Sequence, residues 1–198
     1  MYRRCIVISL AASALAGCAS SSIDAQTKAA ISSVYVEPAQ LSKVAVFAPT
    51  ANELAASGRV PPTVAEASSR LQRLVDTRVQ LAGLVEEQAK RELVQKGYRL
   101  SADSASAGAR LKLIVNHGLS VATGPNDGRG IAMAVGAELV RVSDGKRLVF
   151  GGANQVKDPA RRGIRSAPYA EWLSNDELLV EQYRLVSQAL IAHALEGL

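Results

Sequence analysis

The stretch Ala109-Arg-Leu-Lys-Leu-Ile-Val-Asn-His-Gly-Leu-Ser-Val-Ala-Thr123 decides the fold, because apolar and polar residues alternate along it. A period of two is typical of a strand that buries one face and exposes the other. We therefore expect a sheet that is covered on one side only. The expected buried face carries Leu111, Leu113, Val115, Leu119 and Val121, and the other face carries Arg110, Lys112, Asn116 and Ser120.

Further strands are expected on both sides of this one. Residues 131–142 and 147–156 have strand composition, and Asp144-Gly145 between them predicts a type I′ hairpin turn. Residues 44–48 form an uninterrupted apolar run, which predicts a central strand buried on both faces. Residues 34–36 predict a short edge strand.

A long helix is expected over residues 64–96, after the first core strand. Its apolar residues recur at helical spacing, and Thr63 has the right side chain for an N-cap. Arg78 falls on the apolar stripe and interrupts it. A straight helix of this length would span about 50 Å, so Gly83 marks a bend or a break, or else one end of the helix projects beyond the sheet.

A C-terminal helix is expected to begin at Ser174, where Glu177 completes a capping box. Leu179, Tyr183, Val186 and Leu190 then form an apolar stripe. The order of elements predicts an α+β fold. We expect a four- to five-stranded mixed, mostly antiparallel sheet with the long helix and the C-terminal helix.

The N-terminus has the layout of a secretory signal. Met1–Arg4 is a basic head, and the apolar and small run that follows is too short to cross a bilayer. The run ends in Leu15-Ala16-Gly17-Cys18, which resembles the lipobox of bacterial lipoproteins. The resemblance implies cleavage before Cys18, acyl chains on that cysteine and anchoring in a membrane.

This motif sets the expected domain organisation. Residues 1–17 form the signal peptide, residues 18–33 a flexible tether and residues 34–198 a single α+β periplasmic domain. In Gram-negative lipoproteins an aspartate after the lipidated cysteine favours retention at the inner membrane. Ala19 stands there instead, so we expect a protein anchored in the cell outer membrane and facing the periplasm.

Composition excludes several classes of site. Removal of the signal discards Cys5, and lipidation would consume the thiol of Cys18. No disulfide or cysteine metal site is then expected in the mature chain. Loss of Arg3 and Arg4 lowers the formal net charge from +5 to +3, which does not favour nucleic-acid binding.

No catalytic, cofactor or metal site is expected. His117 is in phase with the apolar face of its strand, which predicts a buried histidine with a hydrogen-bonded ring. His193 has no cysteine or carboxylate at convincing ligand spacing. Neither a phosphate-binding loop nor a nucleophile elbow is present in the sequence.

Residues 157–173 form a long, basic segment with two interpretations. It could be a solvated loop whose Trp172 docks under the start of the last helix. It could instead contact a partner protein, anionic lipid or glycan, since Arg, Tyr and Trp are enriched in binding hot spots. The residues that would carry this contact are Arg161, Arg162, Arg165, Tyr169 and Trp172.

The order of elements also resembles a family. A lipobox and tether precede the strand Lys43-Val-Ala-Val-Phe47, a long helix runs into Lys96-Gly97-Tyr98, and a hairpin follows over residues 137–146. This order resembles the small periplasmic lipoproteins built like the TolB N-terminal domain, a group that includes CsgG and LpoB. The resemblance implies an assembly, transport or activator protein, and no functional residue is carried over from it.

We therefore expect a non-enzymatic accessory subunit of a cell-envelope assembly that serves secretion, transport or wall synthesis. Its expected partners are the membrane, through the acyl chains on Cys18, and an envelope protein or further copies of the same chain. The alternative is a periplasmic lipoprotein that binds a lipid or small molecule.

Overall fold

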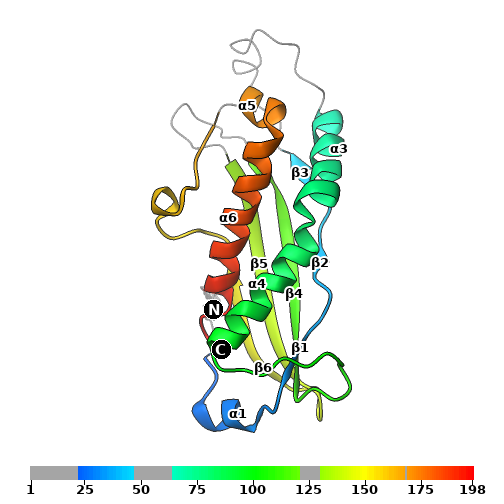
Figure 1. Cartoon of the computed structure of the whole chain (residues 1–198), viewed down its shortest axis with the longest axis vertical. Helices are drawn as coiled ribbons and strands as arrows, with labels where there is room; N and C mark the ends of the chain where they lie inside the picture. The colour runs from blue at the N-terminus through cyan, green and yellow to red at the C-terminus, as the bar shows by residue number, and fades with distance from the viewer. Residues whose placement is uncertain (1–21, 47–63, 121–129, 168) are drawn as a thin grey trace, which may run out of the picture.

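The computed structural model describes residues 22–46, 64–120, 130–167 and 169–198. They form one mixed sheet, and helices α3, α4 and α6 lie over one of its faces (Figure 1). The expected α+β class is confirmed. No helix in these residues combines the length and apolarity needed to cross a bilayer.

The centre of the sheet is a long antiparallel pair. Strand β4 (Ala109–Ser120) pairs over its whole length with β5 (Gly130–Arg141), and β5 pairs with β6 (Arg147–Ala153). Side chains alternate along β4 as expected, with Leu111 buried and Ile114 half exposed. The expected position of Val121 on the buried face lies outside the described residues.

Three short strands share the other edge of β4. Strands β1 (Val34–Val36), β2 (Gln40–Leu41) and β3 (Ala45–Val46) each pair with it in parallel, one after another. The sheet is therefore four strands wide and mostly antiparallel, as expected. The expected edge strand at residues 34–36 is confirmed.

The prediction of a central strand over residues 44–48 is wrong for its described part. Within the described residues β3 pairs with β4 alone, so it lies at an edge. Helix α3 packs beside this edge, and the backbone N–H of Val44 donates to Gln72 Oε1 on that helix at 3.0 Å. Because α3 packs against this part of the chain, an apolar run can be covered here without a neighbouring strand on each side.

The long helical segment is interrupted at Gln80, and not at Gly83. Helix α3 (Val64–Leu74) continues into the π-helical turn η1 (Val75–Val79), and α4 (Leu81–Gln95) begins after a residue with φ of 51°. The wide turn is closed by the N–H of Gln80, which donates to the Val75 carbonyl at 2.8 Å. The extra residue in this turn shifts the apolar stripe, so Val79 is buried and Arg78 points outward. The expected N-cap Thr63 lies outside the described residues.

The C-terminal helix begins one residue later than expected. Ser174 ends the short helix α5 (Tyr169–Ser174), and Asn175 caps α6 (Asp176–Ala194) by accepting from the N–H of Leu178 at 3.0 Å. The expected Ser174–Glu177 capping box is therefore absent. Asn is as good an N-cap as Ser. Because Ser174 and Asn175 are adjacent, the sequence alone does not show which of them caps the helix. The predicted apolar stripe of α6 is buried.

Part of the flexible tether expected over residues 18–33 is helical, and residues 18–21 lie outside the described residues. Asp24 caps helix α1 (Ala25–Ala30) by accepting from the N–H of Thr27 at 2.8 Å. The N–H of Ile23 donates to the Gly197 carbonyl at 2.9 Å, and the Ile23 side chain packs against the core. The chain is therefore attached to the body from its first described turn.

The β5–β6 hairpin has a five-residue loop, residues 142–146, and not the expected two-residue type I′ turn. A type I′ turn needs two central residues with positive φ, and here only Gly145 has one, at 68°. The N–H of Gly145 donates to the Arg141 carbonyl at 3.0 Å. The Asp-Gly pair marked the hairpin correctly, but the turn around it is longer.

The end of α6 packs directly on the backbone of β6. Gly151 lies on the covered face of the sheet, and a methyl group there would overlap the carbonyl oxygen of Ala194. Gly152, the next residue, faces the other way and has room for a methyl group. The absence of a side chain at Gly151 therefore sets how closely α6 approaches the sheet.

We predict that Gly151→Ala destabilises the fold by about 2 kcal/mol, because the added methyl group must push α6 away. Gly152→Ala is the matched control, and we expect it to change stability by less than about 1 kcal/mol. Urea unfolding of both variants measures the difference. Equal effects of the two substitutions would show that α6 does not pack as described.

Candidate functional site

A cavity of about 820 Å³ lies where β6 ends. The last pair between β5 and β6 is Val135 with Ala153, and the chain then leaves the sheet at Asn154. Residues 131–134 of β5 have no β6 partner within the described residues, and the space beside them is the cavity. Its apolar walls come from β5, α6 and the segment after β6. They include Ile131, Met133, Val156, Ile164, Val186 and Leu190.

His117 lines this cavity and joins three elements. Its Nε2 lies 3.1 Å from the Ser42 carbonyl, which can only accept, so Nε2 carries the proton. Nδ1 then accepts from the hydroxyl of Tyr183 on α6 at 3.3 Å. The backbone N–H of His117 donates to Ser42 Oγ at 3.3 Å. The ring thus connects β4, the chain after β2 and α6.

Burial makes both rings neutral. His117 is 5 % exposed, and loss of water lowers the pKa of its imidazole, although the Ser42 bond and the charge of Asp76 partly oppose the shift. Burial also strongly raises the pKa of the Tyr183 hydroxyl. Each ring nitrogen has a hydrogen-bond partner, so the imidazole links neighbouring elements and has no free nitrogen to act as a base. This confirms the expected buried, hydrogen-bonded histidine.

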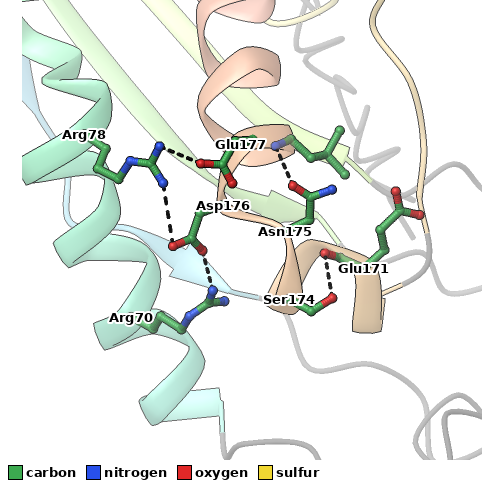
Figure 2. Close-up of polar contacts among 8 residues, drawn as sticks. Arg70, Arg78, Glu171, Ser174, Asn175, Asp176 and Glu177 are labelled. Carbon is green, nitrogen blue, oxygen red and sulfur yellow. Dashed lines mark hydrogen bonds and ion pairs between the residues drawn. The ribbon is translucent and has the colours of Figure 1, made fainter.

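A cluster of charged side chains joins the start of α6 to α3 and η1 (Figure 2). Asp176 accepts from Arg70, and Arg78 reaches Asp176 at 3.9 Å and Glu177 at 2.8 Å. The hydrogen bond from Arg78 lowers the pKa of Glu177. All four side chains are at least a third exposed, so each pair contributes little to stability. They lie at the contact between η1 and the start of α6.

The residues expected to contact a partner are divided by the structure. Arg161 and Arg162 lie on the short 3-10 helix η2 (Pro159–Arg162) and are exposed. Arg165 is also exposed, but it pairs with Glu171 at 3.0 Å. Trp172 is fully buried, as in the alternative in which it docks beneath the helix start. It cannot be a contact residue, and the side chain of Tyr169 lies outside the described residues.

Three further predictions from the sequence concern His193, metal-ligating side chains and Cys18. His193 pairs with Glu196 at 2.9 Å, and this hydrogen bond lowers the pKa of Glu196. No group of three metal-ligating side chains is found among the described residues. Cys18, the expected lipidation site, lies outside them.

The sequence did not predict two polar arrangements, the contacts of His117 and the ion cluster at the start of α6. The partners of His117 are far away in the chain, and nothing in the local pattern points to Tyr183. The ion cluster did leave a signal, because Arg78 interrupts an apolar stripe. A charge at such a position indicates either a change in the helix or a partner, and the structure contains both.

Comparisons with known proteins do not assign the chain to a family. No family model matches it, and no curated protein matches it in sequence. A PelC dodecamer from Paraburkholderia phytofirmans is 16% identical, with 84% of this chain and 86% of that chain covered and a TM-score of 0.30. A hypothetical protein from Chlamydia trachomatis is 12% identical, with 78% and 91% covered and a TM-score of 0.26.

We predict that His117 makes stability depend on pH. The folded state binds the imidazole proton more weakly than the unfolded chain does, so protonation favours unfolding. Stability should be constant above the ordinary pKa of about 6.5 and fall below it, by at most about 1.4 kcal/mol per pH unit for one proton. Urea unfolding from about pH 7.5 down to pH 5.5 tests this window.

The control for this prediction is His117→Gln, which keeps a polar side chain but cannot titrate. The variant is expected to be less stable at neutral pH, and its stability should vary less between the two ends of the window. An equally steep fall in the variant would assign the pH dependence to other groups.

Proposed function

We propose that the protein is a lipid-anchored, non-enzymatic accessory subunit of a cell-envelope assembly, held in the outer membrane and facing the periplasm. The observation that carries this proposal is the lipobox Leu15–Cys18 behind a basic head and a short apolar run. The order of elements, which resembles periplasmic lipoproteins built like the TolB N-terminal domain, supports the same role.

The proposed mechanism is tethering. Two or more acyl chains make a stable anchor, and confinement near one membrane raises the effective concentration of the domain for a partner there. A modest affinity is then sufficient for the partner to be occupied. Such a subunit needs a specific, firmly held contact surface.

Helix η2 has the properties of such a surface. It stands away from the sheet and helices (Figure 1), and it exposes Arg161 and Arg162. Residues with left-handed backbone flank it, Asp158 with φ of 51° and Gly163 with φ of 71°.

The segment after η2 is attached firmly to α6. Gln182 is 2 % exposed, donates to the Gly163 carbonyl and accepts from the backbone N–H of Arg165, both at 3.0 Å. This attachment holds the two arginines in a defined place. Arginine on a rigid support is suited to an acidic protein surface.

The anchor is tested by growing cells with labelled palmitate. We expect label on the wild-type chain and none on Cys18→Ala, because the thiol is the acceptor. Label that persists on the variant would refute the anchor.

The contact surface is tested by co-purification after gentle detergent extraction. We expect Arg161→Ala/Arg162→Ala to reduce recovery of a stoichiometric partner at least about tenfold, since a hot-spot residue contributes over 1 kcal/mol. Arg73→Ala/Arg184→Ala, which removes two exposed arginines elsewhere, is the matched control. An unchanged yield from the η2 variant would exclude this helix from the interface.

A second candidate function is the binding of a lipid or small molecule. The cavity beside residues 131–134 favours it, because about 820 Å³ lies within the usual range for ligand sites and its walls are largely apolar. Native mass spectrometry of the extracted protein separates the two functions. A bound lipid without a protein partner would favour the carrier.

A further inference from the structure

The first described residues limit how far the body can stand from a lipid on Cys18. Four residues lie between Cys18 and Ile23, and the five Cα-to-Cα steps from one to the other span at most about 18 Å. Ile23 is fixed to the body by its hydrogen bond to the Gly197 carbonyl and by its packing against the core. Strand β4 alone is about 40 Å long, so the two ends of the molecule are not equally within reach of the bilayer.

The end within reach is built from three neighbouring segments. The N–H of Gly108 donates to the Ser33 carbonyl at 3.0 Å, which joins the loop of residues 97–108 to the chain after α1. The N–H of Val142 donates to the Gly108 carbonyl at 3.1 Å and adds the hairpin loop. Figure 1 shows α1 and the C-terminus at this end and α3 toward the other. We call this the α1 end.

Three cations of the α1 end have no carboxylate partner in the part of the chain that the structure describes, whereas its acids have local hydrogen-bond or ion-pair partners. Within the described residues, Lys28, Arg99 and Lys146 have no carboxylate within ion-pair distance. Lys28 lies 4.8 Å from the centre of the Tyr98 ring, a contact that leaves the ammonium able to meet an anion. Leu100, next to Arg99, is 42 % exposed, which adds an apolar side chain to the same surface.

The nearby acids are occupied by local partners. Asp24 accepts from the backbone N–H and hydroxyl of Thr27, and Asp103 accepts from the N–H of Ser106 at 3.0 Å. Asp144 pairs with Arg141 at 3.2 Å, and Glu196 pairs with His193. These bonds lower the pKa of Asp24 and Asp103, so both stay ionised but turned to donors of their own segments. These carboxylates keep their charge but are turned toward donors of their own segments, whereas the side chains of Lys28, Arg99 and Lys146 remain able to contact an external anion.

We propose that the α1 end lies on the bilayer and that Lys28, Arg99 and Lys146 contact anionic phospholipid headgroups. This proposal rests on the lipid anchor proposed above. It fixes the orientation of the domain: α3 and the first half of α6 point away from the membrane. Basic side chains at a membrane surface each add to affinity for anionic lipid, so the contact would assist the acyl chains.

The orientation is tested with the lipidated full chain in membranes. Lipidation consumes the thiol of Cys18, so Leu100→Cys and Ser69→Cys each give one site for a fluorophore, at the α1 end and on exposed α3. We expect a nitroxide on lipid headgroups to quench the probe at residue 100 strongly and the probe at residue 69 little. Equal quenching would overturn the orientation. A label that enters Cys18 itself would instead refute the anchor.

The headgroup contact is tested without the lipid, on the mature chain with Cys18→Ser. We expect it to bind vesicles of equal parts phosphatidylcholine and phosphatidylglycerol and not vesicles of phosphatidylcholine alone. Lys28→Gln/Arg99→Gln/Lys146→Gln should weaken binding about a hundredfold. Arg73→Gln/Arg161→Gln/Arg184→Gln, matched in charge, should have a far smaller effect. Equal losses from the two triple variants, or no binding by the parent chain, would overturn the contact.

Discussion

The pairing of β4 with its neighbours is the constraint on which the other elements depend. Its twelve residues are paired with β5 on one side, and β1, β2 and β3 occupy the other side in turn. The alternation of its side chains decides which face of the sheet receives α4 and α6. A shift of β4 by one residue would bring the apolar face to solvent, and it would also remove His117 from Tyr183.

Patterns of neighbouring residues correctly predicted the long strands, the hairpin and the two helical regions. The alternation around Leu111 and Leu113 predicted β4, and the Asp-Gly pair predicted the hairpin after β5. The apolar stripes predicted both helices and the faces they bury. These features follow from the period of side chains and from turn chemistry, which neighbouring residues carry by themselves.

The features that sequence analysis placed wrongly depend on contacts between distant residues. The helix breaks at Gln80, where the π-helical turn ends, and the same turn directs Arg78 to the acids at the start of α6, about a hundred residues further along the chain. His117 was expected to be buried and bonded, yet its partners Ser42 and Tyr183 lie on other elements. Trp172 had two interpretations because composition alone does not distinguish a hot spot from a core residue.

The edge of the sheet formed by β1, β2 and β3 has a consequence for motion. A continuous edge strand is held by an unbroken series of backbone hydrogen bonds, but these short strands are separated by gaps. In the gaps, side chains bond the backbone instead. Glu86 accepts from the N–H of Ala39, Gln72 accepts from the N–H of Val44, and His117 donates to the Ser42 carbonyl. Such segments open as small units well below the free energy of global unfolding. Because Ser42 borders the cavity, that opening would widen the cavity while β4, β5 and β6 stay paired. Hydrogen exchange should therefore be faster in β2 and β3 than in β4, β5 and β6.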